Sequence, residues 1–267
     1  MPTGPSNISS APDAASGIHP GVSAFTLKAA AIIGMTCNHV ANVFSGAFAG
    51  CDPWGAPALL VLYALGGMTF PVMAFLMSEG YAHTSNVRRY AKRLLVFALI
   101  SQVPFSLLWS LVGNVMFTLL AGLGILYARD HCKSIGAFAA CFCLALGISS
   151  FCDWPVIGPL MIFLFHELRG QGARGIMLTM LVPLASTGVP ALANILTGGS
   201  FPSYSLAGTT ALFTSWCELG YACVGFLFAA AFITRYRGRR GRPLKWFFYA
   251  YYPAHLSVIA AAAYLIL

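Results

Sequence analysis

Charged side chains are scarce in this sequence, and their scarcity excludes an ordinary water-soluble domain. Asp, Glu, Lys and Arg make up 8% of the 267 residues, while apolar residues make up 58%. Soluble domains carry about 25% charged residues. The mean hydropathy of +0.78 agrees with this reading. We therefore predict an integral membrane protein whose main partner is the lipid bilayer.

Basic residues are missing from the start of the chain. Residues 1–23 contain no lysine or arginine and are rich in Ser, Pro, Ala and Gly. This pattern excludes a secretory signal, which begins with basic residues before a short apolar core. We predict a disordered tail at 1–23, followed by a single transmembrane domain at 24–267.

Apolar segments of up to about 20 residues follow one another through that domain, and a helix needs about this length to cross the ~30 Å bilayer core. The sequence predicts an all-α, polytopic helical bundle of about nine spanning helices. Their expected ranges are 25–48, 56–81, 88–110, 114–128, 134–150, 154–168, 174–196, 209–234 and 244–266. Residues 190–208 are rich in Gly and Pro and also fit a re-entrant or interfacial segment, so eight or ten helices remain open.

The basic residues gather on one side of this predicted bundle. With nine helices, all 15 Lys and Arg fall on the same side, and the opposite loops hold Asp52 and Asp153. Because short cytoplasmic loops collect Lys and Arg, we expect a cytoplasmic N-terminus and a multi-pass protein of the plasma membrane. The net charge of +8 follows from this orientation, so no nucleic acid is expected as a partner.

The eight cysteines show no spacing typical of a metal site, and no metal is expected. Five of them lie inside predicted helices, where cysteine acts as a small apolar residue. Cys51 and Cys152 fall near outward-facing loops. A disulfide between them is one alternative, and two unpaired thiols are the other.

Polar side chains inside the helices are the candidate functional residues, because they are costly in lipid. At a rise of about 1.5 Å per residue, His39, Gln102 and His255 lie roughly 15–18 Å from the cytoplasmic end of their helices. Glu218, counted from the other side, reaches a similar depth. We expect these four side chains to share an interior cavity.

The first helix carries the densest polar face. Met35, Asn38, His39 and Asn42 recur at helical spacing and must face protein or water. An imidazole at this depth can exchange a proton near neutral pH, and amide side chains can orient it or stabilise an oxyanion. Three interpretations stay open: a hydrogen bond between helices, catalysis, and a proton or ion path.

A basic cluster marks the start of the third helix. Arg88 and Lys92 are four residues apart, as are Arg89 and Arg93, so each two share a face of the helix. Glu79 lies across the preceding turn. Arginine suits bidentate phosphate contacts, so a phosphate-bearing cytosolic ligand could bind here. Membrane orientation and lipid contact explain the same pattern equally well.

Several segments of the chain resemble the TraX family of membrane proteins, in the same order and with similar spacing over nearly the whole chain after the tail. They are LKAAAIIGMTCNHV (27–40), FPVMAFLMSEGYAHTSNVRRYAKRLLVFALISQVPF (70–105), NVMFTLLAGLGIL (114–126), the pair Asp153-Trp154, and YRGRRGRPLKWFFYAYYPAHL (236–256).

The resemblance implies an acetyltransferase. The family is named for N-terminal acetylation of conjugative pilin, and it is similar to transmembrane acyltransferases that use cytosolic acetyl-CoA. In that scheme His39 is the general base, and Asn38 or His255 holds the oxyanion. The phosphate contacts would fall to Arg88, Arg89, Lys92 and Arg93. The acceptor would be a pilin-like protein amine or a cell-surface glycan, in a bacterial plasma membrane.

Two positions depart from the family pattern. Asn38 precedes His39 where members commonly have Asp, and Gln102 stands where they commonly have Glu. Loss of a carboxylate beside His39 weakens the base, moves its orienting role to Glu79 or Glu218, or reflects lost activity. The competing functions are a transporter or ion path and a non-catalytic accessory protein. A transporter favours inverted repeats, and no internal repeat is evident.

Overall fold

The computed structural model describes residues 21–51, 53–109, 113–199 and 206–267. Its helices in chain order are α1 (Ala24–Val43), α2 (Ser45–Ala49), α3 (Gly55–Gly66), α4 (Thr69–Ala82), α5 (Val87–Leu108), α6 (Val115–His131), α7 (Ile135–Ser149), α8 (Ile157–Glu167), η1 (Arg169–Gln171), α9 (Ala173–Pro183), η2 (Leu184–Gly188), α10 (Val189–Leu196), α11 (Ala211–Gly220), η3 (Tyr221–Gly225), α12 (Phe226–Thr234) and α13 (Lys245–Ile266).

The all-α prediction is confirmed, because the described residues form helices and two isolated bridges but no strand. The helices follow the expected ranges closely, with α3 and α4 together filling 56–81. Likewise α9, η2 and α10 together fill 174–196. Four helices are long and apolar enough to cross a membrane: Gly55–Ala82, Val87–Leu108, Ala173–Leu196 and Ala211–Thr234. The number of crossings stays a prediction.

Polar residues set the start of several helices. The side chains of Ser23, Asn86, Asn114 and Thr210 each accept a hydrogen bond from a backbone N–H in the first turn of the helix that follows. Such caps satisfy donors that the helix itself leaves unpaired. These caps therefore fix where the apolar segments become helical.

The long helices bend at defined places. A π-helical turn follows Pro183 at η2, and a second one forms η3. Gly67, between α3 and α4, lies against the Tyr221 carbonyl and Gly225 of η3, where any larger side chain would collide. This close approach packs the junction of α3 and α4 directly against the continuous helix formed by α11, η3 and α12.

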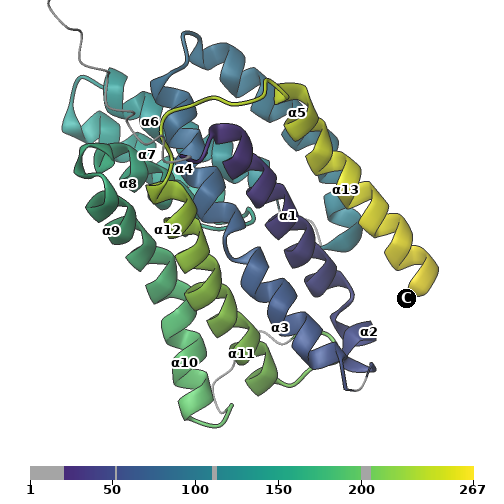
Figure 1. The fold of residues 1–267 in the computed structure, drawn as a ribbon. Coiled ribbons are helices and arrows are strands. Elements are labelled where there is room, and N and C mark those ends of the chain that lie inside the picture. The colour runs from purple at the N-terminus through teal and green to yellow at the C-terminus, as the bar shows by residue number, and fades with distance from the viewer. Residues whose placement is uncertain (1–20, 52, 110–112, 200–205) are drawn as a thin grey trace, which may run out of the picture.

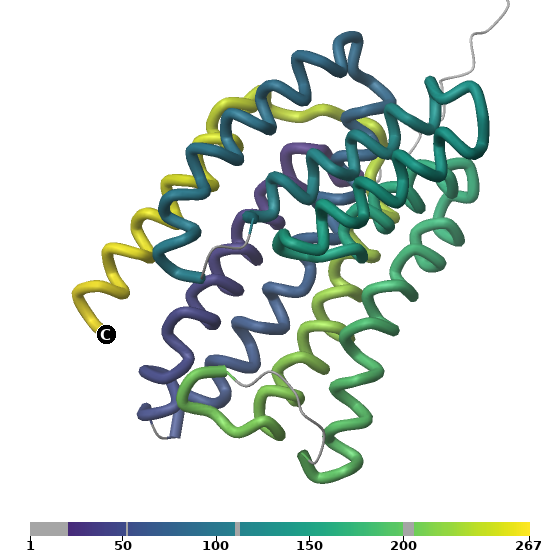
Figure 2. The backbone as a smooth tube through the Cα atoms, turned by 180° about the vertical axis from the view of Figure 1, so that it is seen from behind, coloured from purple at the N-terminus to yellow at the C-terminus, as the bar shows by residue number. Residues whose placement is uncertain are grey.

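The helices form one bundle around α1 and α4 (Figure 1). The α5 and α13 helices pack along one flank, while α9–α10 and α11–α12 run side by side on the other. Figure 2 shows the same arrangement from behind, with α6, α7 and α8 gathered toward one end. The basic loops lie at this same end, where α5 and α13 begin, and we call it the basic end.

The surface of the bundle is apolar, as expected for contact with lipid. Large exposed side chains on α5 include Leu99, Val103 and Leu107, and α7 buries only Ser149. The buried core joins α1, α4, α6, α8, α12 and α13 to the inner face of α5, with Leu27, Phe70 and Leu126 among its members. An apolar exterior of this extent matches a membrane-embedded bundle.

The end of the predicted tail is paired with the loop between α12 and α13. Val22 donates its N–H to the Arg235 carbonyl (3.0 Å), and Ala24 donates to the Arg239 carbonyl (2.8 Å). The Arg237 N–H donates back to Val22 (3.3 Å). Residues 21–23 are therefore part of the fold, while residues 1–20 of the predicted tail lie outside the described residues.

Candidate functional site

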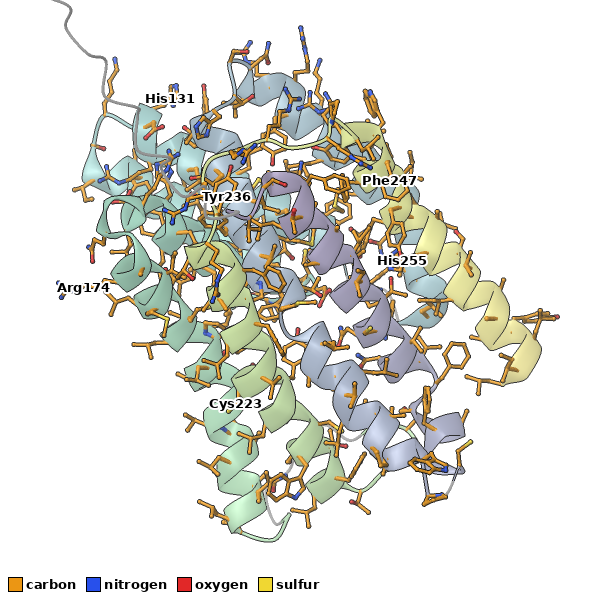
Figure 3. All side chains as sticks on the ribbon, viewed as in Figure 1. His131, Arg174, Cys223, Tyr236, Phe247 and His255 are labelled. Carbon is orange, nitrogen blue, oxygen red and sulfur yellow. The ribbon has the colours of Figure 1, made fainter. Side chains whose placement is uncertain are left out.

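A pair of buried histidines joins α1 to α13 at the centre of the bundle. His39 and His255 are each 7% exposed. His39 Nδ1 lies 2.8 Å from His255 Nε2, and the two ring planes are within 7° of parallel. Figure 3 shows His255 on the side of α13 that faces α1. The pair brings together two residues that are 216 positions apart in the chain.

The direction of this hydrogen bond follows from its neighbours. His255 Nδ1 lies 2.9 Å from the Tyr251 carbonyl, which can only accept, so this nitrogen carries the hydrogen. In a neutral His255, Nε2 is then bare and accepts a hydrogen bond from Nδ1–H of His39. The Nε2 of a neutral His39 is therefore bare in turn and free to accept a proton.

The helix that presents this relay is itself anchored to α1. Thr36 Oγ1 donates to the Ile32 carbonyl (2.8 Å), so the Tyr251 hydroxyl, 2.7 Å away, donates to Thr36 Oγ1. The same Tyr251 supplies the carbonyl that orients His255. The Tyr251–Thr36 hydrogen bond therefore holds α13 against α1 next to the residue that orients His255.

A second hydrogen-bond chain orients Asn38, next to His39. Asn42 Nδ2 lies 2.9 Å from the Asn38 carbonyl, and this acceptor fixes the orientation of the Asn42 amide. Its Oδ1 therefore accepts from the Tyr63 hydroxyl (2.8 Å), and its Nδ2 also donates to Asn38 Oδ1 (3.2 Å). With its oxygen engaged, Asn38 keeps its Nδ2–H groups available as donors.

Two cavities lie near the histidine pair, and His39 lines one of them. The first, about 520 Å³, opens at the basic end and reaches inward to Met35 and Tyr252. The second, about 450 Å³, lies toward the opposite end and is lined by Asn38 and His39. The ring centroids of His39 and Tyr252 are 6.4 Å apart, so these two side chains separate the cavities. The His39 imidazole thus faces the second cavity, and the first cavity reaches Tyr252 beside it.

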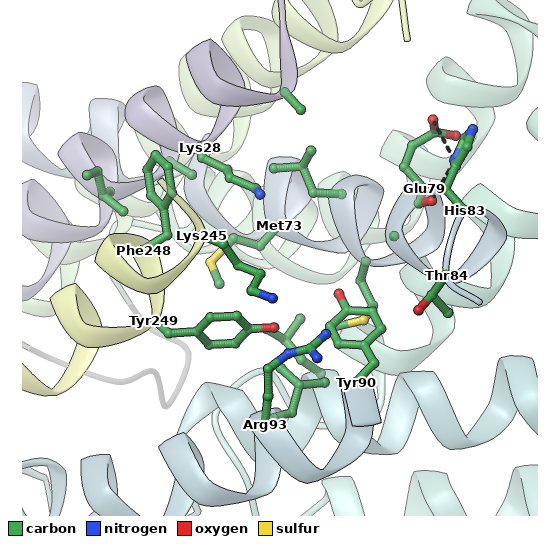
Figure 4. Close-up of a pocket in the computed structure, with 18 of the residues that line it drawn as sticks. Lys28, Met73, Glu79, His83, Thr84, Tyr90, Arg93, Lys245, Phe248 and Tyr249 are labelled. Carbon is green, nitrogen blue, oxygen red and sulfur yellow. Dashed lines mark hydrogen bonds and ion pairs between the residues drawn. The ribbon is translucent and has the colours of Figure 1, made fainter. Parts of the chain in front are cut away.

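The first cavity, which we call the basic cavity, is lined by the cations Lys28, Arg93, Arg240 and Lys245. Figure 4 shows three of them, Lys28, Arg93 and Lys245, pointing into the same space. Arg93 is the member of the sequence-predicted basic cluster that lines this cavity. The other three, Arg88, Arg89 and Lys92, are exposed outside it.

The second cavity, which we call the acidic cavity, carries the carboxyl groups of Asp153 and Glu218 beside an aromatic wall. The wall includes Trp109, whose ring centroid lies 4.9 Å from that of His39. No lysine or arginine of the described residues lines this cavity. Its chemistry therefore differs sharply from that of the basic cavity.

The loop that carries Asp153 is strained. Trp154 and Val156 have φ of 58° and 57°, and such a backbone costs a β-branched residue such as valine about 1–3 kcal/mol. Trp154 is held by stacking on Phe70, with centroids 4.3 Å apart, and Thr118 donates to the Asp153 carbonyl. The sequence predicts this loop on the outer side, which stays a prediction; in the structure it joins the short helices α7 and α8 and lines the same cavity as His39.

Burial raises the pKa of Asp153 to about 6, although the Trp154 N–H opposes this shift. In the unfolded chain the carboxyl ionises near its ordinary value, so the stabilisation of the native protonated form is lost as pH rises from about 4 to 6. We expect Asp153→Asn to exceed wild type in stability at pH 7.5 by roughly 1–3 kcal/mol, with a smaller margin at pH 4.5. Thermal unfolding in detergent at both pH values tests this, and a margin that is equal or larger at pH 4.5 would contradict it.

The remaining predicted residues lie in different surroundings. Glu79 lines the basic cavity, where its carboxylate pairs with Arg169 (2.9 Å). Glu218 shares the acidic cavity with His39. Gln102 does not line either cavity; its Oε1 accepts from Asn114 Nδ2 (2.9 Å), the residue that caps α6. Of the four polar groups expected in one cavity, His39 and Glu218 line it, while His255 contacts His39 without lining either cavity.

The cysteines and the residues of metal-ligand type are scattered through the fold. All eight cysteines are free thiols, including Cys51 and Cys152, so the disulfide alternative is absent from the structure. No group of three His, Cys, Asp or Glu side chains capable of holding a metal ion occurs within the described ranges.

The sequence reasoning missed several lining residues. Lys28, Arg240 and Lys245 counted among the 15 basic residues of the orientation signal, and Tyr63 and Trp109 were assigned no role. Asp153 stood in a motif already noted, Asp153-Trp154, but with no role. Lys28, Asp153, Arg240 and Lys245 lie within the segments that resemble the family, and this position was the signal that could have found them.

The fold and site define a helical membrane protein with a buried histidine pair between a basic and an acidic cavity. The chain belongs to the TraX family, which matches residues 23–262 under the description "TraX protein". A similar protein of Dichelobacter nodosus, the probable fimbrial assembly protein FimC, serogroup H1, is 29% identical over 262 residues, covering 90% of this chain and 95% of that protein. No solved structure matches this chain.

Proposed function

We propose that this protein is an integral membrane acyltransferase of the bacterial plasma membrane. It transfers an acetyl group from cytosolic acetyl-CoA to an amine or hydroxyl acceptor at or across the membrane. The observation that carries the proposal is the hydrogen-bond relay through His255, which leaves Nε2 of His39 bare at the wall of the acidic cavity, next to Tyr252 at the inner end of the basic cavity. A base placed between two access routes suits a reaction between a donor and an acceptor that enter from different ends.

The basic cavity suits the donor. Acetyl-CoA joins a phosphate-bearing nucleotide to a long neutral arm that ends in the thioester. The cavity matches this division, with cations near its mouth and Met35, Met116 and Leu119 farther in. Met35 lies one helical turn before His39. An arm that follows this path brings the thioester to the histidine pair.

The reaction runs in two steps. His39 Nε2 takes the proton of the acceptor amine or hydroxyl as that group attacks the thioester carbon. The oxyanion that forms accepts hydrogen bonds from Asn38 Nδ2. As the carbon–sulfur bond breaks, the thiolate of CoA takes the proton from His39 Nε2. The products are the acetylated acceptor and free CoA, and His39 returns to its starting form.

Direct attack is preferred to a cysteine intermediate. Cys152 lines the acidic cavity, but burial and the neighbouring Asp153 raise the pKa of its thiol. A thiol with a raised pKa is a poor nucleophile at neutral pH. The acetyl group therefore passes from CoA to the acceptor in one transfer.

The acidic cavity is the acceptor site in this proposal. The name of the similar Dichelobacter nodosus protein, a probable fimbrial assembly protein, supports a role in pilus assembly and a pilin-like protein amine as acceptor. A cell-surface glycan that offers a hydroxyl is the other acceptor class. Aromatic and carboxyl side chains can contact either one.

One observation favours a second function, a proton or ion path. Two cavities that approach a titratable pair from opposite ends are also expected of a path with alternating access. A path of this kind predicts pH changes inside proteoliposomes and no consumption of acetyl-CoA. Acyl transfer predicts the reverse.

The first experiment is acetyl transfer by the purified full-length chain in lipid nanodiscs. Acetyl-CoA is supplied with hydroxylamine as a small nucleophile, and CoA release is followed by chromatography above the uncatalysed background. In parallel, calorimetry measures acetyl-CoA binding. We expect binding and CoA release from wild type. A folded wild type that neither binds millimolar acetyl-CoA nor releases CoA rules out the acyltransferase.

A further inference from the structure

The four cations of the basic cavity come from three separate parts of the chain. Lys28 lies in the second turn of α1, Arg93 on α5, and Arg240 and Lys245 in and after the loop that precedes α13. Lys28 experiences the positive charges of both Arg240 and Lys245. Convergence of like charges raises the energy of the folded state unless an anion is bound among them.

The protein supplies little counter-charge to this cluster. Glu79 is the acidic side chain that lines the cavity, and its carboxylate pairs with Arg169 and lies 4.0 Å from His83. The ion pairs found over the described ranges use none of the four cluster cations. Arg93 Nε is also buried and has no hydrogen-bond partner within the protein. The cluster therefore offers hydrogen-bond donors and positive charge to an anionic ligand.

Aromatic side chains hold the cations in place. The Arg93 guanidinium lies 5.6 Å from the Tyr90 ring centroid, and the Lys28 ammonium lies 5.5 Å from that of Phe248. Tyr249 also lines the cavity, and Figure 4 shows its ring between Arg93 and Lys245. Contacts of this type limit side-chain motion before a ligand arrives, which favours a preformed site.

We propose that Lys28, Arg93, Arg240 and Lys245 form a phosphate-binding site in the basic cavity. The ligand is an anion with two or more phosphate charges, because four cations would neutralise it in a space of about 520 Å³. The exposed Arg88, Arg89 and Lys92 are not part of this site. The inference deepens the proposed function, on which it rests for the identity of the donor, since acetyl-CoA carries its phosphates on the nucleotide. A phospholipid headgroup offers the same chemistry.

The test measures binding of adenosine 3′,5′-bisphosphate to the full-length chain in zwitterionic nanodiscs by calorimetry. We expect Lys28→Gln, Arg93→Gln and Lys245→Gln each to weaken binding by about 10-fold or more, since each removes a charge-assisted contact. The matched variants Arg88→Gln, Arg89→Gln and Lys92→Gln are expected to change it less than about twofold. If Arg93→Gln does not fold, Arg240→Gln on the exposed loop replaces it.

A second arm distinguishes the two sources of phosphate. The same variants are compared for retention of phosphatidylglycerol by native mass spectrometry. Loss of either ligand in the cluster variants alone supports the site and identifies its source. If wild type binds neither ligand, or if the exposed arginines matter as much as the cluster, the inference is wrong. A cluster that binds phosphate in a protein that releases no CoA overturns the acyltransferase alone. Cluster variants that keep the wild-type rate of CoA release and also retain both phosphate ligands overturn this inference alone.

Discussion

Replacing His39 by glutamine is expected to lower the rate of acetyl transfer by about 10²–10⁴-fold, the usual contribution of a positioned general base. Glutamine keeps the polarity and approximate size of histidine but cannot take a proton at neutral pH. Affinity for acetyl-CoA should stay within about twofold, because His39 lies beyond the cations that bind phosphate in our proposal. CoA release and calorimetry on the same preparation measure the two effects.

The matched control is His131→Gln. His131 is exposed at the end of α6, where its Nδ1 lies 2.9 Å from the Tyr127 carbonyl of its own helix. This change should leave the rate within about twofold, as expected for a surface substitution. A folded His39→Gln protein that retains more than a tenth of the wild-type rate would contradict the role of His39 as the base.

The relay gives a physical account of the missing carboxylate beside His39. A carboxylate in that position would orient the imidazole, but here His255 accepts from Nδ1–H of His39 and fixes the same tautomer. A neutral His255 imidazole orients the His39 ring without adding a negative charge to the interior, where an unpaired charge is costly. The relay is therefore one way for Asn38 to replace an acidic residue without disorienting the base.

The helices could be predicted from the sequence, because apolar length and capping residues decide them locally. The direction in which each polar side chain points could not. Gln102 lies at the depth of His39 along its helix, yet it turns toward Asn114 and braces α6. Depth follows from counting residues, whereas the face of a helix that meets protein depends on packing. In this chain buried and lipid-facing residues are similarly apolar, so periodicity gives little guidance.

The ligand-facing cations could not be selected from the sequence for a related reason. All 15 Lys and Arg fit an orientation signal, and the pairs at a spacing of four residues draw attention to Arg88 and Arg89. The convergence of α1, α5 and α13 instead directs Lys28, Arg93 and Lys245 into one cavity. Likewise, Asp153 reaches the acidic cavity because α7 and α8 are short apolar helices. Both outcomes are properties of the tertiary arrangement.

Asn38→Ala is expected to lower the transfer rate by about 10²–10³-fold, the usual loss when one oxyanion donor is removed. The structure adds a stricter expectation, because the Tyr63 hydroxyl is linked to Asn38 through the amide of Asn42. Tyr63→Phe alone should lower the rate by about 5–10-fold, the order of one hydrogen bond. The Michaelis constant for acetyl-CoA should not change in either variant, since neither residue lines the basic cavity.

The double variant separates positioning from packing. If Tyr63 works by holding Asn38 in the donor orientation, then Tyr63→Phe should change the rate by less than about twofold once Asn38 is alanine. If Tyr63 only packs α3 against α1, its loss should multiply with that of Asn38, and the two effects would be independent. Independent effects would contradict the orienting chain while leaving His39 as the base. Non-additive effects would place the oxyanion next to Asn38, on the acidic-cavity side of the histidine pair, where the acceptor must then attack.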